Sequence, residues 1–166
     1  MVSDAKDIYE IFSNDAITQY YDVSTYTSVN QAEQFIARMN DRFATGEGIR
    51  WALALKSTNQ LIGTCGYNAI SQRSQRAIIG YELKQIFWGQ GYMPEALQAI
   101  LRYGFEELSL NRIEAFVMLD NHQSVCMLKK LRFVEEGILR EYGFWKSKFW
   151  DLHCFSLLKR EFCDRA

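Results

Sequence analysis

Two glycines, Gly89 and Gly91, stand two residues apart directly before a strongly periodic apolar segment, in the stretch "WGQGYMPEALQAILRYGFEEL". A helix that begins after a glycine-containing turn presents unpaired backbone N–H groups and the positive end of its dipole, so anions such as phosphates bind well there. Pro94 suits the first helical turn, where its missing N–H costs nothing. The spacing excludes a P-loop and a dinucleotide fingerprint. The local pattern permits either an anion site or a turn needed only to reverse the chain.

A second group of polar residues lies in "DNHQS", ahead of another apolar helical pattern. Asp120 or Asn121 is a natural N-cap there, and Ser124 falls in the first helical turn. Capping alone explains this group as well as a role in chemistry does.

Two glutamates are candidates for a general base. Glu82 lies in a strand-like run between Tyr81 and Leu83, and a carboxylate among apolar neighbours becomes more basic because it is desolvated. Glu141 in "LREYGFW" is the second candidate. Each of them could instead be an ordinary solvent-facing acid, so the base stays open.

The cysteines give no sign of a metal site. Four cysteines (Cys65, Cys126, Cys154 and Cys163) have no CxxC spacing, and only two histidines accompany them. We expect reduced thiols, mostly buried, and no metal.

The elements that must position these residues follow from hydrophobic periodicity. Helical spacing predicts helices over 4–13, 29–43, 95–108 and 121–133. Short strand-like runs at 50–56, 60–67 and 76–84 predict an antiparallel meander, and "RIEAFVML" and two strands around "WKSK" complete the set. This order predicts an α/β (α+β) fold in which a mixed, mostly antiparallel sheet is flanked by helices, as one domain over 1–166.

Composition limits the classes of partner. The chain has 166 residues and a net charge of −1, so a broad basic surface for direct nucleic acid binding is not expected. No stretch approaches the length of an apolar membrane span, and the start has no signal-peptide pattern. A cytoplasmic protein with a small or peptide-like partner is predicted.

Four segments together resemble the GNAT superfamily of acetyl-CoA-dependent N-acetyltransferases, and within it the group of the ribosomal-protein acetyltransferases RimJ and RimL. They are "DAKDIYEIFSNDAITQYY", "IGYELKQIFWGQGYMPEAL", "LNRIEAFVMLDNHQSVCMLKKLRFVEEGILRE" and "FWDLHCFSLL". The resemblance implies the GNAT fold and acetyl-CoA as cosubstrate. It also implies that the turn from Trp88 to Pro94 holds the coenzyme's pyrophosphate, that Asn121 contacts the pantetheine arm, and that Ser124 donates a proton to the departing thiolate. The implied cofactor contacts are Leu83, Trp88, Gly89, Gln90, Gly91, Tyr92, Met93, Asn121 and Ser124.

The sequence departs from the family pattern at several positions. Leu128 replaces a tyrosine that many members use as the general acid for the leaving thiolate. Gly143 stands where some relatives carry a glutamate that acts as the general base. Arg132 precedes Phe133 in place of the usual glycine, so we expect the helix to end without a left-handed glycine cap. Members usually begin with a strand before the first helix. This sequence starts almost at that helix, so the sheet is expected to lack its first strand and to leave an edge that a loop, a partner chain or a second subunit could cover.

The resemblance also implies an amine acceptor, which must lose its proton before it can attack a thioester. An α-amine with a pKa of about 8 is roughly 10% neutral at pH 7, whereas lysine with a pKa of about 10.4 is almost fully charged. A site without an evident strong base therefore favours the N-terminal α-amine of a protein, such as a ribosomal protein, attacking the bound thioester directly. The alternatives are a small-amine or polyamine acetyltransferase, a non-catalytic acyl-CoA-binding module, and an acyl carrier acting through Cys126. The aromatic residues around "WKSK" are expected either to pack in the core or to line the acceptor cleft.

Overall fold

The computed structural model describes residues 4–163. Its helices are α1 (Ala5–Phe12), α2 (Asp15–Thr18), α3 (Val29–Ala44), α4 (Tyr92–Glu106), α5 (His122–Lys130) and α6 (Lys159–Cys163). Its strands are β1 (Ile49–Ala54), β2 (Leu61–Ser71), β3 (Arg76–Leu83), β4 (Arg112–Met118), β5 (Val134–Trp145) and β6 (Lys148–Leu158). Within 4–163, every helix is too short or too polar to cross a membrane.

The strands form one six-stranded sheet in the order β1-β2-β3-β4-β6-β5. Neighbours pair antiparallel everywhere except between β3 and β4, which are parallel. The predicted mixed, mostly antiparallel sheet and its opening meander are therefore confirmed. Two α-helices were not predicted: α2 and α6 have only four and five residues, too few to show a helical period.

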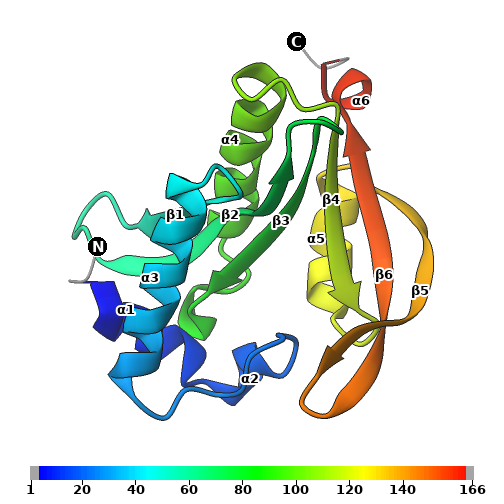
Figure 1. Ribbon diagram of the computed structural model, residues 1–166. Helices are drawn as coiled ribbons and strands as arrows, with labels where there is room; N and C mark the ends of the chain where they lie inside the picture. Colours follow the sequence, from blue (N-terminus) through cyan, green and yellow to red (C-terminus); the bar gives the residue numbers. More distant parts are fainter. Residues whose placement is uncertain (1–3, 164–166) are drawn as a thin grey trace.

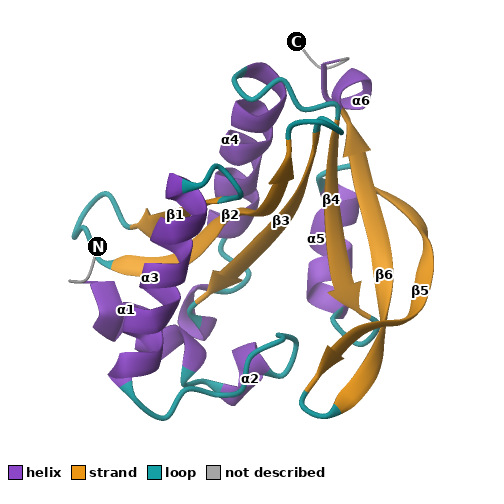
Figure 2. Ribbon diagram, in the orientation of Figure 1, coloured by secondary structure: helices purple, strands orange, loops and turns teal. Residues whose placement is uncertain are grey.

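Helices cover both faces of the sheet (Figures 1 and 2). On one face, the apolar stripe of α4 packs on the sheet together with α5, and its fully buried members include Leu97, Leu101 and Phe105. On the other face, α1 and α3 form a separate apolar cluster around Phe12, which reaches Leu61 of β2. Because both of its faces are covered, β2 is buried continuously over its first seven residues rather than alternately.

The predicted glycine turn begins α4 earlier than the apolar period suggested. Gly91 is the N-cap, with a left-handed φ of +88°, and the helix starts at Tyr92 rather than at Glu95. Pro94 consequently lies in the first turn, as expected. The left-handed backbone at Gly91 and at Gly89 (φ +74°) explains why this turn needs two glycines.

The end of α5 has a left-handed cap, although no glycine supplies it. Arg132 has φ +65°. The Arg132 N–H donates to the Lys129 carbonyl and the Phe133 N–H to the Leu128 carbonyl, each at 3.0 Å. These two bonds form a Schellman motif, so an arginine occupies the position that glycine usually takes.

The two edges of the sheet are β1 and β5. Among residues 4–163, the first strand in chain order is β1, which begins at Ile49. At the opposite edge, most residues of β5 are exposed.

Candidate active site

The site lies where the two central strands separate. Pairing between β3 and β4 is limited to Arg76–Ile78 opposite Arg112–Glu114, although β3 continues to Leu83 and β4 to Met118. Figure 1 shows the two strands diverging beyond this point. A cavity of about 680 Å³ opens between the diverging ends, and the glycine turn, α5, the α2 segment and the β5–β6 hairpin also line it. Its volume lies in the usual range for a small-molecule site.

The backbone of β3 presents amide groups to this cavity. The Tyr81 carbonyl accepts a hydrogen bond from the Tyr21 hydroxyl, and the Leu83 carbonyl accepts one from the Trp88 indole at 2.8 Å. By contrast, the Lys84 N–H donates to Ile62 of β2. Since the N–H and C=O of one strand residue point the same way, the N–H groups of Tyr81 and Leu83 face away from β2 and toward the gap.

The glycine turn forms one end of the cavity and fits an anionic group. Apart from the glycine itself and its adjacent backbone, no heavy atom of the described chain lies within 4 Å of the place where a Cβ would stand at Gly89 or Gly91, so the backbone can be approached there. The N-terminus of α4 adds unpaired N–H groups and a positive dipole end. Among the predicted cofactor contacts, the cavity is lined by Leu83, Trp88, Gly89, Gly91, Tyr92, Met93, Asn121 and Ser124.

Gln90 is the one predicted cofactor residue that the structure does not bring to the cavity. Its side chain is exposed and donates to the Ile86 carbonyl at 2.8 Å.

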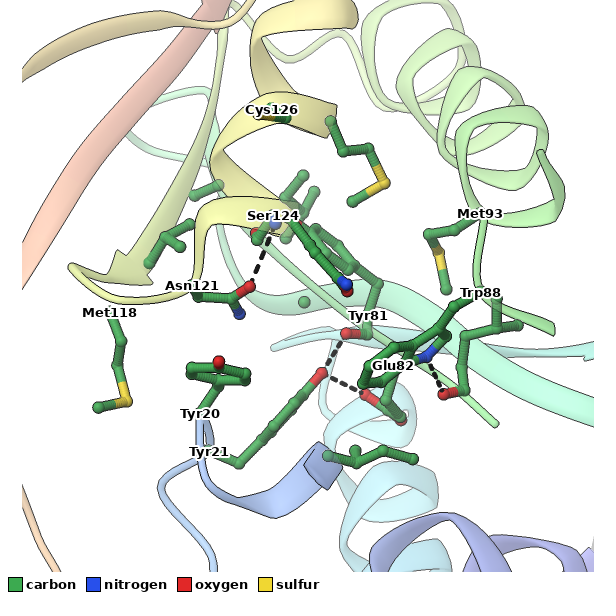
Figure 3. Close-up of a pocket in the computed structure, with 18 of the residues that line it drawn as sticks. Tyr20, Tyr21, Tyr81, Glu82, Trp88, Met93, Met118, Asn121, Ser124 and Cys126 are labelled. Carbon is green, nitrogen blue, oxygen red and sulfur yellow. Dashed lines mark hydrogen bonds between the residues drawn. The ribbon is translucent and has the colours of Figure 1, made fainter. Parts of the chain in front are cut away.

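Asn121 and Ser124 lie together at the start of α5 (Figure 3). Asn121, rather than Asp120, is the N-cap, and its Oδ1 accepts the Ser124 N–H at 3.1 Å. The Ser124 side chain is buried, and its Oγ lies 2.6 Å from the Tyr81 hydroxyl. Burial raises the pKa of Tyr81 to about 12, and the bond to Ser124 partly offsets this. Sequence reasoning did not single out Tyr81.

Glu82 lines the cavity, but its surroundings differ from the apolar ones expected. Its side chain is fully buried and forms an ion pair with Arg50, while the Thr64 hydroxyl also donates to its carboxylate. Burial alone would lower the pKa of Arg50, and the adjacent Glu82 carboxylate raises it above its usual value. Glu82 therefore belongs to a polar network that joins β1, β2 and β3.

Tyr21 completes this network from the segment that follows α2. Its hydroxyl lies 3.2 Å from Glu82 Oε2, in addition to its bond to the strand carbonyl (Figure 3). Burial, followed by the nearby Glu82 charge, raises the pKa of Tyr21 well above its usual value. The alternation of side chains along β3 does not reveal that Arg50 and Tyr21 contact Glu82, because both residues come from other elements.

Glu141 is not brought to the cavity. It is exposed on β5, where its N–H donates to Asp151 Oδ1 at 2.7 Å, and it has a φ of +51°. Gly143, the position at which some relatives were expected to carry a base, lies against the Trp145 ring. Of the two predicted bases, the structure therefore places only Glu82 at the cavity.

The cavity also extends between the α2 segment and the β5–β6 hairpin. Lys146 at the hairpin tip donates to the Thr18 carbonyl at 2.8 Å and connects the two sides. Trp145 lines the cavity, and Asp22 does so from the opposite side. Of the other aromatic side chains near the hairpin tip, Tyr142, Phe144 and Phe149 are exposed. Trp150 is half-buried and stacks on Trp145.

The cysteines do not form a reactive or metal-binding cluster in the described part of the chain. Burial raises the pKa of Cys65 to about 12 and also raises that of Cys154. Cys126 is an exposed free thiol beside the cavity. Within residues 4–163, no group of three or more potential metal-ligating side chains comes together.

Comparison with known sequences shows the family of this chain. Residues 1–134 match the acetyltransferase (GNAT) domain. The uncharacterized N-acetyltransferase p20 of Bacillus licheniformis is 41% identical over 161 residues, which cover 97% of this chain and 90% of that protein. The ribosomal-protein-serine acetyltransferase of Escherichia coli is 30% identical over 98 residues, or 59% of this chain and 55% of that protein.

Solved structures share the fold. RimL, the ribosomal L7/L12 alpha-N-protein acetyltransferase, in complex with coenzyme A, has a TM-score of 0.86 at 22% identity, covering 95% of this chain and 90% of that one. The spermidine N-acetyltransferase of Vibrio cholerae, in complex with CoA and spermine, has a TM-score of 0.83 at 22% identity, covering 97% and 93%. The expected GNAT fold is therefore confirmed.

Proposed function

We propose that the acceptor of this chain is the N-terminal α-amine of a protein. The premise is that the chain belongs to the GNAT acetyltransferase family, in its RimJ/RimL-type group, and is an acetyl-CoA-dependent N-acetyltransferase. A ribosomal protein is a suitable target class, as the name of the E. coli relative states for that enzyme.

The donor end of the cavity suits acetyl-CoA. The pyrophosphate would lie at the glycine turn, against the backbone N–H groups of Gly89 and Gly91 and the start of α4. The Tyr81 and Leu83 N–H groups, which face the gap, would bind carbonyl oxygens of the pantetheine arm and of the thioester. Asn121 holds the first turn of α5 in position for Ser124.

A single observation favours an α-amine over a polyamine. Two carboxylates line the cavity in the described chain, Asp22 and Glu82, and Glu82 already neutralises Arg50. One carboxylate, Asp22, is then left to attract a cation. A polyamine carries several cations and needs several acidic partners, whereas a peptide N-terminus brings one. The α-amine also loses its proton more easily than an alkyl amine.

In the proposed reaction the neutral amine attacks the thioester carbonyl, the C–N bond forms and the C–S bond breaks. The Ser124 O–H donates a hydrogen bond to the departing sulfur, and the thiolate later takes its proton from solvent. The proton that the amine loses passes to Glu82 or to water, with Glu82 as the candidate base because it lines the cavity and Glu141 does not.

The test is a screen of acceptors with labelled acetyl-CoA: peptides with free N-termini, the same peptides with blocked N-termini and an internal lysine, and spermidine. We expect product with free N-termini only. Product with spermidine but not with peptides would overturn the proposed acceptor and leave acetyl transfer intact.

Asp22→Asn provides a second test of the acceptor end. We expect it to raise the KM for the peptide roughly 3- to 10-fold, because one exposed charge contact is lost, while the KM for acetyl-CoA is unchanged. Asp41→Asn, an exposed acid on α3 outside the cavity, is the matched control. An equal effect of both substitutions would contradict a role for Asp22 in attracting the amine.

A further inference from the structure

Ser124 has one hydroxyl proton, and Ser124 can donate a hydrogen bond to the departing sulfur only if that proton points into the cavity. The Ser124 side chain is buried, and its Oγ lies 2.6 Å from the Tyr81 hydroxyl. If Ser124 donates to Tyr81, its proton is occupied and cannot reach a sulfur atom. If Tyr81 donates instead, the Ser124 O–H is free to point into the cavity that both residues line.

Chemistry decides the direction of this bond. A phenol is a stronger acid than an alkanol and hence the better hydrogen-bond donor, whereas the alkanol oxygen is the better acceptor. The two residues are also held independently: the Ser124 N–H is bonded to Asn121, and the Tyr81 carbonyl accepts from Tyr21. The short distance is thus maintained by fixed backbone on both sides.

We propose that Tyr81 is a positioning residue for acetyl transfer: it donates its phenol O–H to Ser124 Oγ and so directs the Ser124 O–H at the thioester sulfur. The inference rests on the proposed role of Ser124. As the C–S bond breaks, the electron pair goes to sulfur, and the resulting thiolate accepts a hydrogen bond from Ser124. Neither hydroxyl gives up its proton, and the thiolate takes one from solvent when the product leaves.

The acidities agree with hydrogen-bond donation rather than full proton transfer. The pKa of Tyr81, about 12, lies above the value near 8.5 of an ordinary thiol, so moving the phenol proton to sulfur would be uphill. A donor chain in which one hydroxyl polarises the next strengthens the final bond without ionising either group.

The first experiment is a double-mutant cycle on kcat and on the KM for acetyl-CoA. Ser124→Ala is expected to lower kcat roughly 100-fold, as for loss of a direct donor to developing charge. Tyr81→Phe is expected to lower kcat roughly 3- to 10-fold, as for loss of one neutral hydrogen bond, with KM unchanged. The double variant should be no slower than Ser124→Ala, because Tyr81 acts only through Ser124.

Tyr67→Phe is the matched control. Tyr67 is a buried tyrosine on β2 whose hydroxyl donates to the Ile100 carbonyl, outside the cavity. This variant should lower stability but leave kcat within twofold. Multiplicative losses in the Tyr81→Phe/Ser124→Ala variant, or a Tyr81→Phe effect on KM alone, would overturn the inference.

The second experiment replaces Tyr81 with fluorinated tyrosines of increasing acidity. A stronger phenol donor should raise kcat, roughly 1.5- to 3-fold per pKa unit, and this dependence should vanish in the Ser124→Ala background. A purely structural tyrosine would give a flat series, which would refute the inference. If Ser124→Ala itself keeps full kcat, both the role of Ser124 and this inference fail, while the α-amine acceptor is judged separately by its product.

Discussion

Arg50→Met is expected to lower the free energy of unfolding by about 3–5 kcal/mol, or Tm by roughly 6–20 °C. The magnitude follows from burial: the Arg50 side chain is 7% exposed and that of Glu82 is 0% exposed. Arg50 also donates to Thr64 Oγ1 at 2.8 Å and to Asn68 Oδ1 at 2.7 Å. Removing Arg50 leaves a buried carboxylate with hydroxyl donors alone, and most of the cost comes from this uncompensated charge.

Urea denaturation of three variants tests this reasoning. Arg50→Met/Glu82→Leu should recover most of the lost stability, since removing both charges also removes their desolvation cost. Arg76→Met is the control for an exposed pair: Arg76 is 53% exposed and 3.6 Å from Glu114, and its loss should cost less than about 1 kcal/mol. The reasoning is refuted if Arg50→Met lowers the free energy of unfolding no more than Arg76→Met does. It is also refuted if Arg50→Met/Glu82→Leu is less stable than Arg50→Met, because the Arg50–Glu82 pair would then not carry a desolvation cost.

Three further predictions concern the glycine turn, the α5 cap and the Glu136 carboxylate of β5. Gly91→Val should raise the KM for acetyl-CoA roughly 10-fold or more, since a side chain would occupy the phosphate approach and φ +88° is strained for valine; Gly46→Val, with φ +72° outside the cavity, should destabilise without changing KM. Arg132→Gly should stabilise the protein by about 1 kcal/mol in urea denaturation, because it relieves a left-handed arginine at φ +65°, and a loss of stability would contradict the strain. The pKa of Glu136 is lowered to about 2 by Arg112 and then by Ser156, so its contribution to stability is present above about pH 4.5 and is lost as the pH falls toward 2; Glu136→Gln should flatten the acid side of the Tm profile, and an unchanged profile would count against the pair.

Sequence reasoning predicted the helices and strands that are long enough to show a regular spacing of apolar residues. The apolar repeats of α3 and α4, the three short strands of the meander and the glycine turn all carry their signal within one segment. The start of α4 was placed three residues late because Tyr92 and Met93 precede the regular stripe, and the left-handed cap of α5 was missed because Arg132 fills a glycine position.

Contacts between elements were the part that sequence reasoning missed. The environment of Glu82 depends on register: Thr64 lies opposite Glu82, and Arg50 reaches it from the next strand over. The Tyr81–Ser124 pair likewise joins a strand to a helix 43 residues further along the chain. Alternation along β3 shows that Tyr81 and Glu82 point to opposite faces, but it does not show what each one meets.

The separation of β3 from β4 leaves the N–H groups of Tyr81 and Leu83 facing the gap without pairing from β4. Protein stability should therefore depend on occupancy, because a ligand with amides of its own supplies the pairing that the two strands do not give each other. Saturating ligand at 100 times its dissociation constant would add about 2.7 kcal/mol to folding. Amide hydrogen exchange at Tyr81 and Leu83 should slow as the fraction of ligand-bound protein rises. The bound substrate would then occupy the gap between β3 and β4 as an additional strand does.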